Sequence, residues 1–334
     1  MRKLPCLQEL ALLLAVFFLH SSSFAASFDC RVPSTARARL ICSDQELSRV
    51  DGDLGRAYQG SLAVLSRRGR KLLQESQRSW LHFIGTVCPI SRPALPPNVP
   101  GPVQCIQREY EARLEQLSAV GRKRGPYTFI RVDVFAVSPD NEDNTGRRTG
   151  FRYAHLAYPQ IDSPDTPATR AWNEHVTKKM PIPGGCEGSA DDDVDFQLGI
   201  ESPRLISLAW QESHYCHGTP HGVFGYRSDN QVLLPSRRDL LPSDLFKPDP
   251  ALASQLELAF WGALQAQGWT PPNDDAKELI LDAAAAPQNW LLTGTGLSVD
   301  FSAYAGGCYA CNPRPITVPW DELKPLLASD AIAP

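Results

Sequence analysis

The chain has 334 residues, of which 43% are hydrophobic, and a formal net charge of −4 at pH 7. This length and apolar content exclude a chain too small for a hydrophobic core of its own and are enough for two domains. The charge is uneven: residues 27–118 carry 13 Lys and Arg against 9 Asp and Glu, whereas residues 119–334 carry 18 against 27. A basic half joined to an acidic half bears on partners and solubility rather than on fold.

The N-terminus has the pattern of a secretory signal peptide. Arg2 and Lys3 precede the apolar run 10–19, and small residues follow up to Ala25. Ten apolar residues are too few to span a bilayer but suit the hydrophobic region of a signal peptide. We expect residues 1–25 to be removed by cleavage after Ala25 and the mature chain to be periplasmic or secreted, with no membrane span. An uncleaved N-terminal anchor is the alternative.

Cleavage also removes Cys6 and leaves eight cysteines. An even number in an exported chain predicts disulfides, because no thiol buffer keeps the cysteines reduced. Four of them lie in each half, and four cysteines allow three pairings, among which the sequence does not choose. The eight are Cys30, Cys42, Cys88, Cys105, Cys186, Cys216, Cys308 and Cys311.

The first half has the periodicity of helices. Apolar residues recur every three or four positions in three stretches, and Ser43 with Glu46 predicts a capping box at the start of the first. The Pro-rich segment 89–102 cannot be helical and must loop. We therefore expect a disulfide-linked three-helix bundle over residues 27–119. The three stretches are 47–65, 73–87 and 106–117.

The second half has a different pattern, beyond a Gly- and Arg-rich linker at residues 120–126. Apolar and polar residues alternate in three segments, as in half-buried strands. Helices are expected after Pro167 and Pro250. Strands that outnumber helices, without regular alternation, predict an α+β domain with a mainly antiparallel sheet at residues 127–328. The three strand segments are 129–137, 194–200 and 297–301.

The cysteines of the first half lie in register with a series of other residues. The series consists of Phe28-Asp29-Cys30, Leu40 to Leu47 (LICSDQEL), Asp51, Tyr58, Gln77 to Leu81 (QRSWL), Cys88, Cys105, Tyr110, Arg113 and Leu114. With these motifs, residues 28–118 resemble the lysozyme-inhibitor family named after LprI, apart from a long Pro-rich insert before Cys105. The resemblance implies two disulfides in a small envelope module and, since some members are reported to inhibit lysozyme, binding to that enzyme.

The second half carries a separate ordered series of motifs. They are Tyr158 to Ile161 (YPQI), Trp172 to His175 (WNEH), His217 to His221 (HGTPH), Leu241 to Phe246 (LPSDLF), Thr295 to Tyr304, and Ile316 to Lys324. Over residues 127–327 this order is similar to the extracytoplasmic domain of the lysozyme-sensing anti-sigma factor RsiV. Cys216, Cys308 and Cys311 depart from that domain and suggest extra cross-links. The chain has no sigma-binding segment, so signalling by that route is not expected.

A group of histidines and cysteines offers ligands for a metal. The group consists of His214, Cys216, His217 and His221, together with Cys308 and Cys311. Zinc accepts such His and Cys ligands at tetrahedral geometry. The alternative, favoured by oxidising export, is that the cysteines form disulfides and the histidines shape a turn. Cys308-Tyr309-Ala310-Cys311 has the spacing of a redox pair but lacks the strand and helix around a thioredoxin motif.

The strongest acidic run comprises Glu187, Asp191, Asp192, Asp193 and Asp195. Clustered carboxylates suit calcium, and they also suit a basic protein partner such as an animal-type lysozyme. The alternative is a solvated loop. We expect the run to contribute to partner binding.

The sequence predicts a non-enzymatic binding protein of the cell envelope without a cofactor, since no hydrolase motif is recognised. The expected partner is lysozyme or a related muramidase, inhibited by occlusion of its cleft. The rival hypothesis is an accessory protein that grips cell-wall glycan, such as peptidoglycan, or zinc. Nucleic acid is not an expected partner.

Overall fold

The computed structural model describes residues 26–90, 101–140, 150–181, 186 and 189–332, so the expected signal peptide lies outside the described residues. The chain forms two compact units. Met1–Gly60 with Cys88–Ser118 make up the first, and Ser61–Val87 with Ala119–Pro334 make up the second. Within the described residues, no helix has both the length and the apolar content to cross a membrane.

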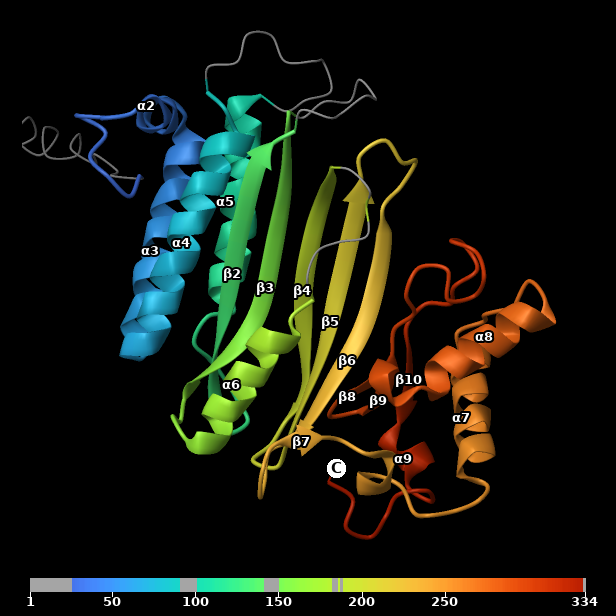
Figure 1. Cartoon of the computed structure of the whole chain (residues 1–334). Helices are drawn as coiled ribbons and strands as arrows, with labels where there is room; N and C mark the ends of the chain where they lie inside the picture. The colour runs from blue at the N-terminus through green and yellow to red at the C-terminus, as the bar shows by residue number, and fades with distance from the viewer. Residues whose placement is uncertain (1–25, 91–100, 141–149, 182–185, 187–188, 333–334) are drawn as a thin grey trace, which may run out of the picture. The chain divides into compact units, whose positions relative to one another are not determined.

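The first unit is helical and cross-linked, as expected. It contains α2 (Ala36–Ser43), most of α3 (Gln45–Val64) and α5 (Pro102–Ser118) (Figure 1). Disulfides join Cys30 to Cys42 and Cys88 to Cys105, and the second closes the chain on either side of the Pro-rich insert. The buried apolar residues follow the predicted helical spacing; they include Leu47, Val50, Leu54, Ile106, Tyr110 and Leu117.

The start of α3 differs from the prediction. The expected capping box at Ser43 and Glu46 is wrong, because α2 continues through Ser43 and the hydroxyl of Ser43 donates to the carbonyl of Leu40. Asp44 caps α3 instead: the backbone N–H of Leu47 donates to Oδ1 of Asp44 at 2.9 Å. Two helices therefore follow each other directly, separated by one extended residue.

The second unit is built on a mainly antiparallel sheet, which confirms the expected α+β class. Within the described residues the sheet has seven strands in the order of the sequence. The pair β3 and β4 is parallel, and the other neighbouring pairs are antiparallel. The strands are β1 (Arg122–Arg124), β2 (Tyr127–Pro139), β3 (Phe151–Ser163), β4 (Ala190–Glu201), β5 (Leu205–Cys216), β6 (Val223–Val232) and β7 (Arg238–Asp239). Strand β1 thus occupies part of the segment expected as a linker.

Helix α6 (Pro167–Lys179) connects the two parallel strands. Thr166 caps the helix, and Pro167 occupies its first turn. Its buried face carries Trp172, whose ring lies edge-on to Phe129 of β2 with ring centroids 5.8 Å apart. Asn173 accepts a hydrogen bond from the backbone N–H of Ile161 and donates one to its carbonyl, which fixes α6 on β3.

Helix α4 (Arg67–Val87) belongs to the second unit and packs against β2. Phe83 lies with its ring centroid 5.3 Å from that of Phe135 and 5.7 Å from that of Tyr153. At the start of the helix, Asp162 of β3 accepts hydrogen bonds from the backbone N–H and the hydroxyl of Ser66. The predicted boundaries 27–119 and 127–328 stay proposals.

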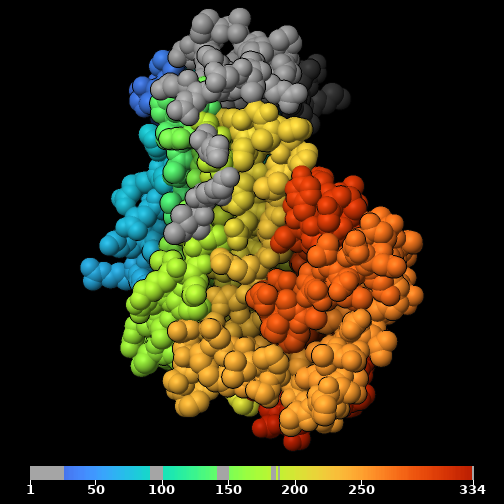
Figure 2. All heavy atoms as spheres, turned by 45° about the vertical axis from the view of Figure 1, so that its right-hand side comes forward, coloured from blue at the N-terminus to red at the C-terminus, as the bar shows by residue number. Residues whose placement is uncertain are grey.

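A second, smaller sheet lies in the C-terminal part of this unit, and its strand β8 contacts β5 and β6. Figure 2 shows the C-terminal residues in orange and red beside the yellow residues of the larger sheet. The core of this C-terminal part includes Phe246, Phe260, Ile280 and Trp290, all at most 2% exposed. The C-terminal elements are the strands β8 (Trp290–Leu292), β9 (Gly296–Val299) and β10 (Ile316–Pro319), the helices α7 (Leu252–Ala266), α8 (Asp274–Ala285) and α9 (Trp320–Leu323), and the 3-10 helices η1 (Pro242–Asp244) and η2 (Pro287–Asn289).

Candidate functional site

A buried carboxylate anchors the beginning of the described chain to the first unit. Oδ2 of Asp51, on α3, accepts hydrogen bonds from the backbone N–H and the hydroxyl of Ser27, both at 2.6 Å. Gly55 allows this approach, since a Cβ there would lie 2.7 Å from that of Ser27. Burial raises the pKa of the Tyr110 phenol, and the Asp51 charge raises it further. Two disulfides and this contact thus link segments of the first unit that are distant in sequence.

The predicted acidic run lies on a strand rather than in a loop. Asp191, Asp192, Asp193 and Asp195 all belong to β4. Because successive residues of a strand point to opposite faces, Asp192 faces away from the other three. Glu187 lies outside the described residues. The run is therefore part of the sheet, with each carboxylate positioned by its neighbouring strands.

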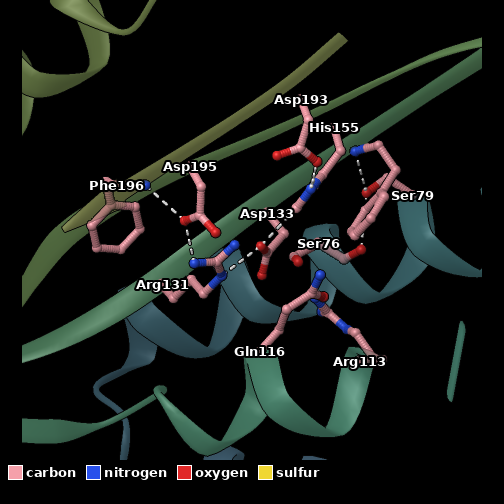
Figure 3. Close-up of polar contacts among 11 residues, drawn as sticks. Ser76, Ser79, Arg113, Gln116, Arg131, Asp133, His155, Asp193, Asp195 and Phe196 are labelled. Carbon is pink, nitrogen blue, oxygen red and sulfur yellow. Dashed lines mark hydrogen bonds and ion pairs between the residues drawn. The ribbon is translucent and has the colours of Figure 1, made fainter. Parts of the chain in front are cut away.

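A chain of charges joins β2, β3 and β4 (Figure 3). Asp193 lies 2.9 Å from Nδ1 of His155, and Oδ1 of Asp133 lies 3.0 Å from its Nε2. Arg131 donates to Oδ1 of Asp133 at 2.8 Å and to Oδ1 of Asp195 at 2.6 Å. Two basic side chains therefore neutralise most of the charge of three carboxylates.

Burial alone would lower the pKa of His155, but its hydrogen bonds to Asp133 and Asp193 outweigh this and raise the pKa to about 9. The ring also stacks on Phe135, with centroids 4.5 Å apart. His155 is therefore a cation at neutral pH, held between two carboxylates.

Asp191 and Asp192, the remaining described carboxylates of the run, each contact a histidine of the predicted zinc site. Nδ1 of His217 lies 2.6 Å from Asp140, and its Nε2 lies 3.2 Å from Asp191. Burial lowers the pKa of His217, but its hydrogen bonds to both carboxylates raise it overall. On the opposite face, His214 of β5 lies directly across from Asp192 of β4, with Nδ1 2.6 Å from the carboxylate. These pairs indicate a structural role, and partner binding by the acidic run stays a prediction.

The cysteines of the second unit form disulfides, between Cys186 and Cys216 and between Cys308 and Cys311. As disulfides they offer no free thiolates as zinc ligands. Among the described residues, His214, His217 and His221 do not form a group with converging ligand atoms. The structure thus does not assemble the predicted His and Cys site.

An exposed aromatic cluster surrounds His221 instead. The ring centroid of Tyr309 lies 4.2 Å from that of His221, 5.7 Å from Tyr304 and 5.9 Å from Phe224. Tyr304 is 47% exposed and Tyr309 is 39% exposed. Tyr304 also has a φ of 65°, which is unfavourable for a bulky side chain. We call these four residues the aromatic cluster.

One group was missed by the sequence reasoning. His175, Asp229 and Asp239 each offer a ligand atom, and these atoms lie within 4.8 Å of one another. His175 occurs in the WNEH motif, which indicated a resemblance to the RsiV domain but no metal site. The spacing to Asp229 and Asp239 gives no local signal, since α6 and the β6–β7 pairing bring the three together.

The N-terminal part of the chain has recognisable relatives. Residues 30–117 match the model of the family described as Lysozyme inhibitor LprI. The proteins named Lipoprotein LprI from Mycobacterium tuberculosis and Mycobacterium bovis are each 33% identical over 98 residues. That alignment covers 29% of this chain and 44% of each relative, so the chain spans less than half of their length.

Solved structures align with the rest of the chain. A DUF3298 family protein from Pseudomonas aeruginosa PAO1 is 15% identical, with a TM-score of 0.45, and covers 63% of this chain and 98% of its own. A member of that family from Bacteroides fragilis is 19% identical, with a TM-score of 0.42, and covers 63% and 97%. The resemblance to RsiV stays a prediction. Residues 30–117 are thus similar to the LprI lysozyme inhibitor family, and an α+β unit makes up most of the rest of the chain.

Proposed function

We propose that this chain is a non-enzymatic protein of the cell envelope that binds lysozyme or a related muramidase and inhibits it. The proposal includes export and removal of residues 1–25. One observation carries it: the match to the lysozyme-inhibitor family covers residues 30–117, the segment that contains the disulfides Cys30–Cys42 and Cys88–Cys105.

Inhibition would act by steric occlusion of the enzyme's cleft. Such a mechanism favours a surface that is rigid before binding, because ordering it on contact would reduce affinity. The two disulfides, the one-residue junction at Asp44 and the anchoring of Ser27 by Asp51 support this rigidity. The chain itself supplies no chemistry in this mechanism.

The test uses the mature full-length chain with a panel of purified lysozymes of different classes. Complex formation is measured by calorimetry and lysis by the turbidity of a cell-wall suspension. We expect a complex with at least one class and slower lysis by that enzyme. A chain that forms no complex and leaves lysis unchanged across all classes contradicts the proposal.

We propose glycan contact as a second candidate function, on the strength of the aromatic cluster. Exposed aromatic rings pack against the apolar faces of sugar rings, while tyrosine hydroxyls offer hydrogen bonds. The supporting loop is held in place: Asn312 donates to the carbonyl of Ser302 at 2.6 Å and accepts from the N–H of Gly306 at 2.9 Å. A backbone kept at an unfavourable φ while its ring is exposed is typical of a functional surface.

The test is sedimentation with insoluble peptidoglycan. The double variant Tyr304→Gly and Tyr309→Ala removes two rings, and glycine relieves the backbone at residue 304. Leu258→Ala, at an apolar residue of α7 that is 70% exposed, is the matched control. We expect the control to bind as the parent does and the double variant to bind at least tenfold less. Equal binding by both variants would rule out the aromatic cluster as the glycan site.

A further inference from the structure

A cavity of about 260 Å³ opens between α6, β6, β7 and the residues of η2. Trp210 of β5 and Leu240 contribute apolar surface to its lining, and most of the remaining lining is polar. His175, Asp229 and Asp239 all line this cavity. The group of converging ligand atoms therefore faces a space large enough for an ion with bound water.

The three side chains differ in how firmly they are held. His175 is 9% exposed, and its Nε2 lies 3.1 Å and 2.8 Å from the two oxygens of Asp229. The Asp229 side chain is 12% exposed, whereas that of Asp239 is 80% exposed. Two ligands are thus fixed inside the fold, and the third stands at the mouth, where an ion can enter.

A buried amide orients both carboxylates. Nε2 of Gln231, a residue 2% exposed, donates to Oδ1 of Asp229 at 2.5 Å and to Oδ1 of Asp239 at 2.8 Å. The amide oxygen accepts from Arg237 at 2.6 Å, which fixes the direction of the amide. Groups that orient ligands in this way are a general feature of metal sites. This amide does not contact the second oxygen of either carboxylate; Oδ2 of Asp229 faces Nε2 of His175 at 2.8 Å.

Two basic residues, Arg227 and Lys179, line the cavity and could repel a cation. Arg227 donates to the backbone carbonyl of Lys179 and lies 3.9 Å from Glu212, so its charge is partly balanced away from the group. Lys179 has a flexible side chain that can extend into water. Arg237 lies 4.0 Å from Oδ1 of Asp239, so one guanidinium stands beside the two carboxylates and the imidazole where the ligand atoms converge.

We propose that His175, Asp229 and Asp239 bind a divalent metal ion of the zinc class. The ion would take the place of the hydrogen between Nε2 of His175 and Asp229, and water from the cavity would complete its coordination. An imidazole ligand favours zinc and similar transition metals over calcium or magnesium, which prefer oxygen alone. This site lies apart from the histidines that the sequence suggested, and it does not depend on lysozyme binding.

The experiment uses the full mature chain, purified without a polyhistidine tag and stripped with a chelator. Zinc is titrated by calorimetry, and thermal unfolding is followed with and without zinc. Asp239→Asn is the informative variant, because its exposed side chain can change without disturbing the core. Asp321→Asn, at an exposed residue of α9, and His221→Gln, in the sequence-predicted set, are the matched controls.

We expect one zinc ion per chain, a higher melting temperature with zinc and at least tenfold weaker binding by Asp239→Asn, while both controls behave as the parent does. Calcium and magnesium should bind at least tenfold more weakly than zinc. No zinc-dependent change in the parent, or equal binding by Asp239→Asn, would overturn the site. Loss of binding in His221→Gln alone would overturn it as well, and equal binding of calcium would overturn the zinc-class assignment.

Discussion

His155 and Asp193 are partners across the parallel strand pair, and Nδ1 of the histidine lies 2.9 Å from Oδ2 of the carboxylate. The other ring nitrogen contacts Asp133, so the ring bridges β2 and β4 from its place on β3. Because β3 and β4 meet only over a short register, this pair reinforces the junction between them.

This bridge makes stability depend on pH. The folded-state pKa of His155 is raised from 6.5 to about 9, so its contribution is complete below about pH 6.5 and is lost as pH rises through 9. We expect the parent to lose on the order of 3 kcal/mol of unfolding free energy from this residue between pH 6 and pH 10. Urea unfolding at both pH values measures it.

His155→Gln should remove that part of the pH dependence and should be less stable than the parent at pH 6. His221→Gln is the control, because His221 is exposed and its Nδ1 lies near a backbone carbonyl rather than a carboxylate. If His155→Gln loses as much stability as the parent between the two pH values, the bridge is not the cause.

Asn173 fixes α6 to β3 through both backbone groups of Ile161. Asn173→Ala leaves a buried N–H and a buried carbonyl with fewer partners, and we expect a loss of roughly 2–3 kcal/mol in unfolding free energy. The neighbouring Glu174→Ala removes an exposed ion pair with Lys178 and should leave the unfolding free energy nearly unchanged. Chemical denaturation of both variants measures the difference, and equal losses would contradict this role of Asn173.

Gly199 lies at a tightly packed position and Gly262 at an open one, so the two should respond differently to substitution by alanine. A Cβ at Gly199 of β4 would lie 2.1 Å from the carbonyl oxygen of Leu292, whereas a Cβ at Gly262 of α7 would meet nothing within 4 Å. Gly199→Ala should lower the melting temperature, with a loss of about 1–3 kcal/mol. Gly262→Ala should raise stability by up to about 1 kcal/mol. A melting temperature of Gly199→Ala that is unchanged or raised would show that the β4–β8 approach is not tight.

The disulfides should contribute different amounts to the free energy of unfolding. Cys88 and Cys105 are separated by 17 positions, and Cys308 and Cys311 by 3. In the chain-entropy model, replacing the first pair by serine costs about 3 kcal/mol and replacing the second about half as much. Denaturation of the two double variants tests this order, and mass spectrometry should find no free thiol in the parent. A larger loss from the second pair would contradict the order.

The helices could be predicted because their signals are local. Pro167 marks the start of α6, and the spacing of Trp172 and Val176 marks its buried face. The one-residue error at Ser43 arose because two adjacent helices compete for the same capping residues. The second half of β4 was found from its alternation, but Asp191 to Asp195 were also considered as a solvated loop, since their partners come from distant strands.

The candidate metal group could not be predicted, because its three residues come from segments that are distant in the sequence. Asp229 and Asp239 meet through the pairing of β6 with β7, and His175 reaches them only because α6 is fixed on the sheet. Conversely, proximity in sequence suggested a site at His214, His217 and His221, although alternate residues of strands and turns point in different directions. Disulfide formation was predictable from the even number of cysteines beyond the predicted signal peptide, but the pairing required the structure.

Inhibition of lysozyme is the central claim, and the most direct measurement is the rate of cell-wall lysis with increasing amounts of the mature chain. We expect the rate to fall in a saturable way for at least one lysozyme class, with a midpoint that agrees with the dissociation constant from calorimetry. Cys308→Ser with Cys311→Ser should inhibit as the parent does, because that pair lies outside residues 30–117. A lysis rate that stays constant for every class, at concentrations well above those of the enzymes, would contradict the claim.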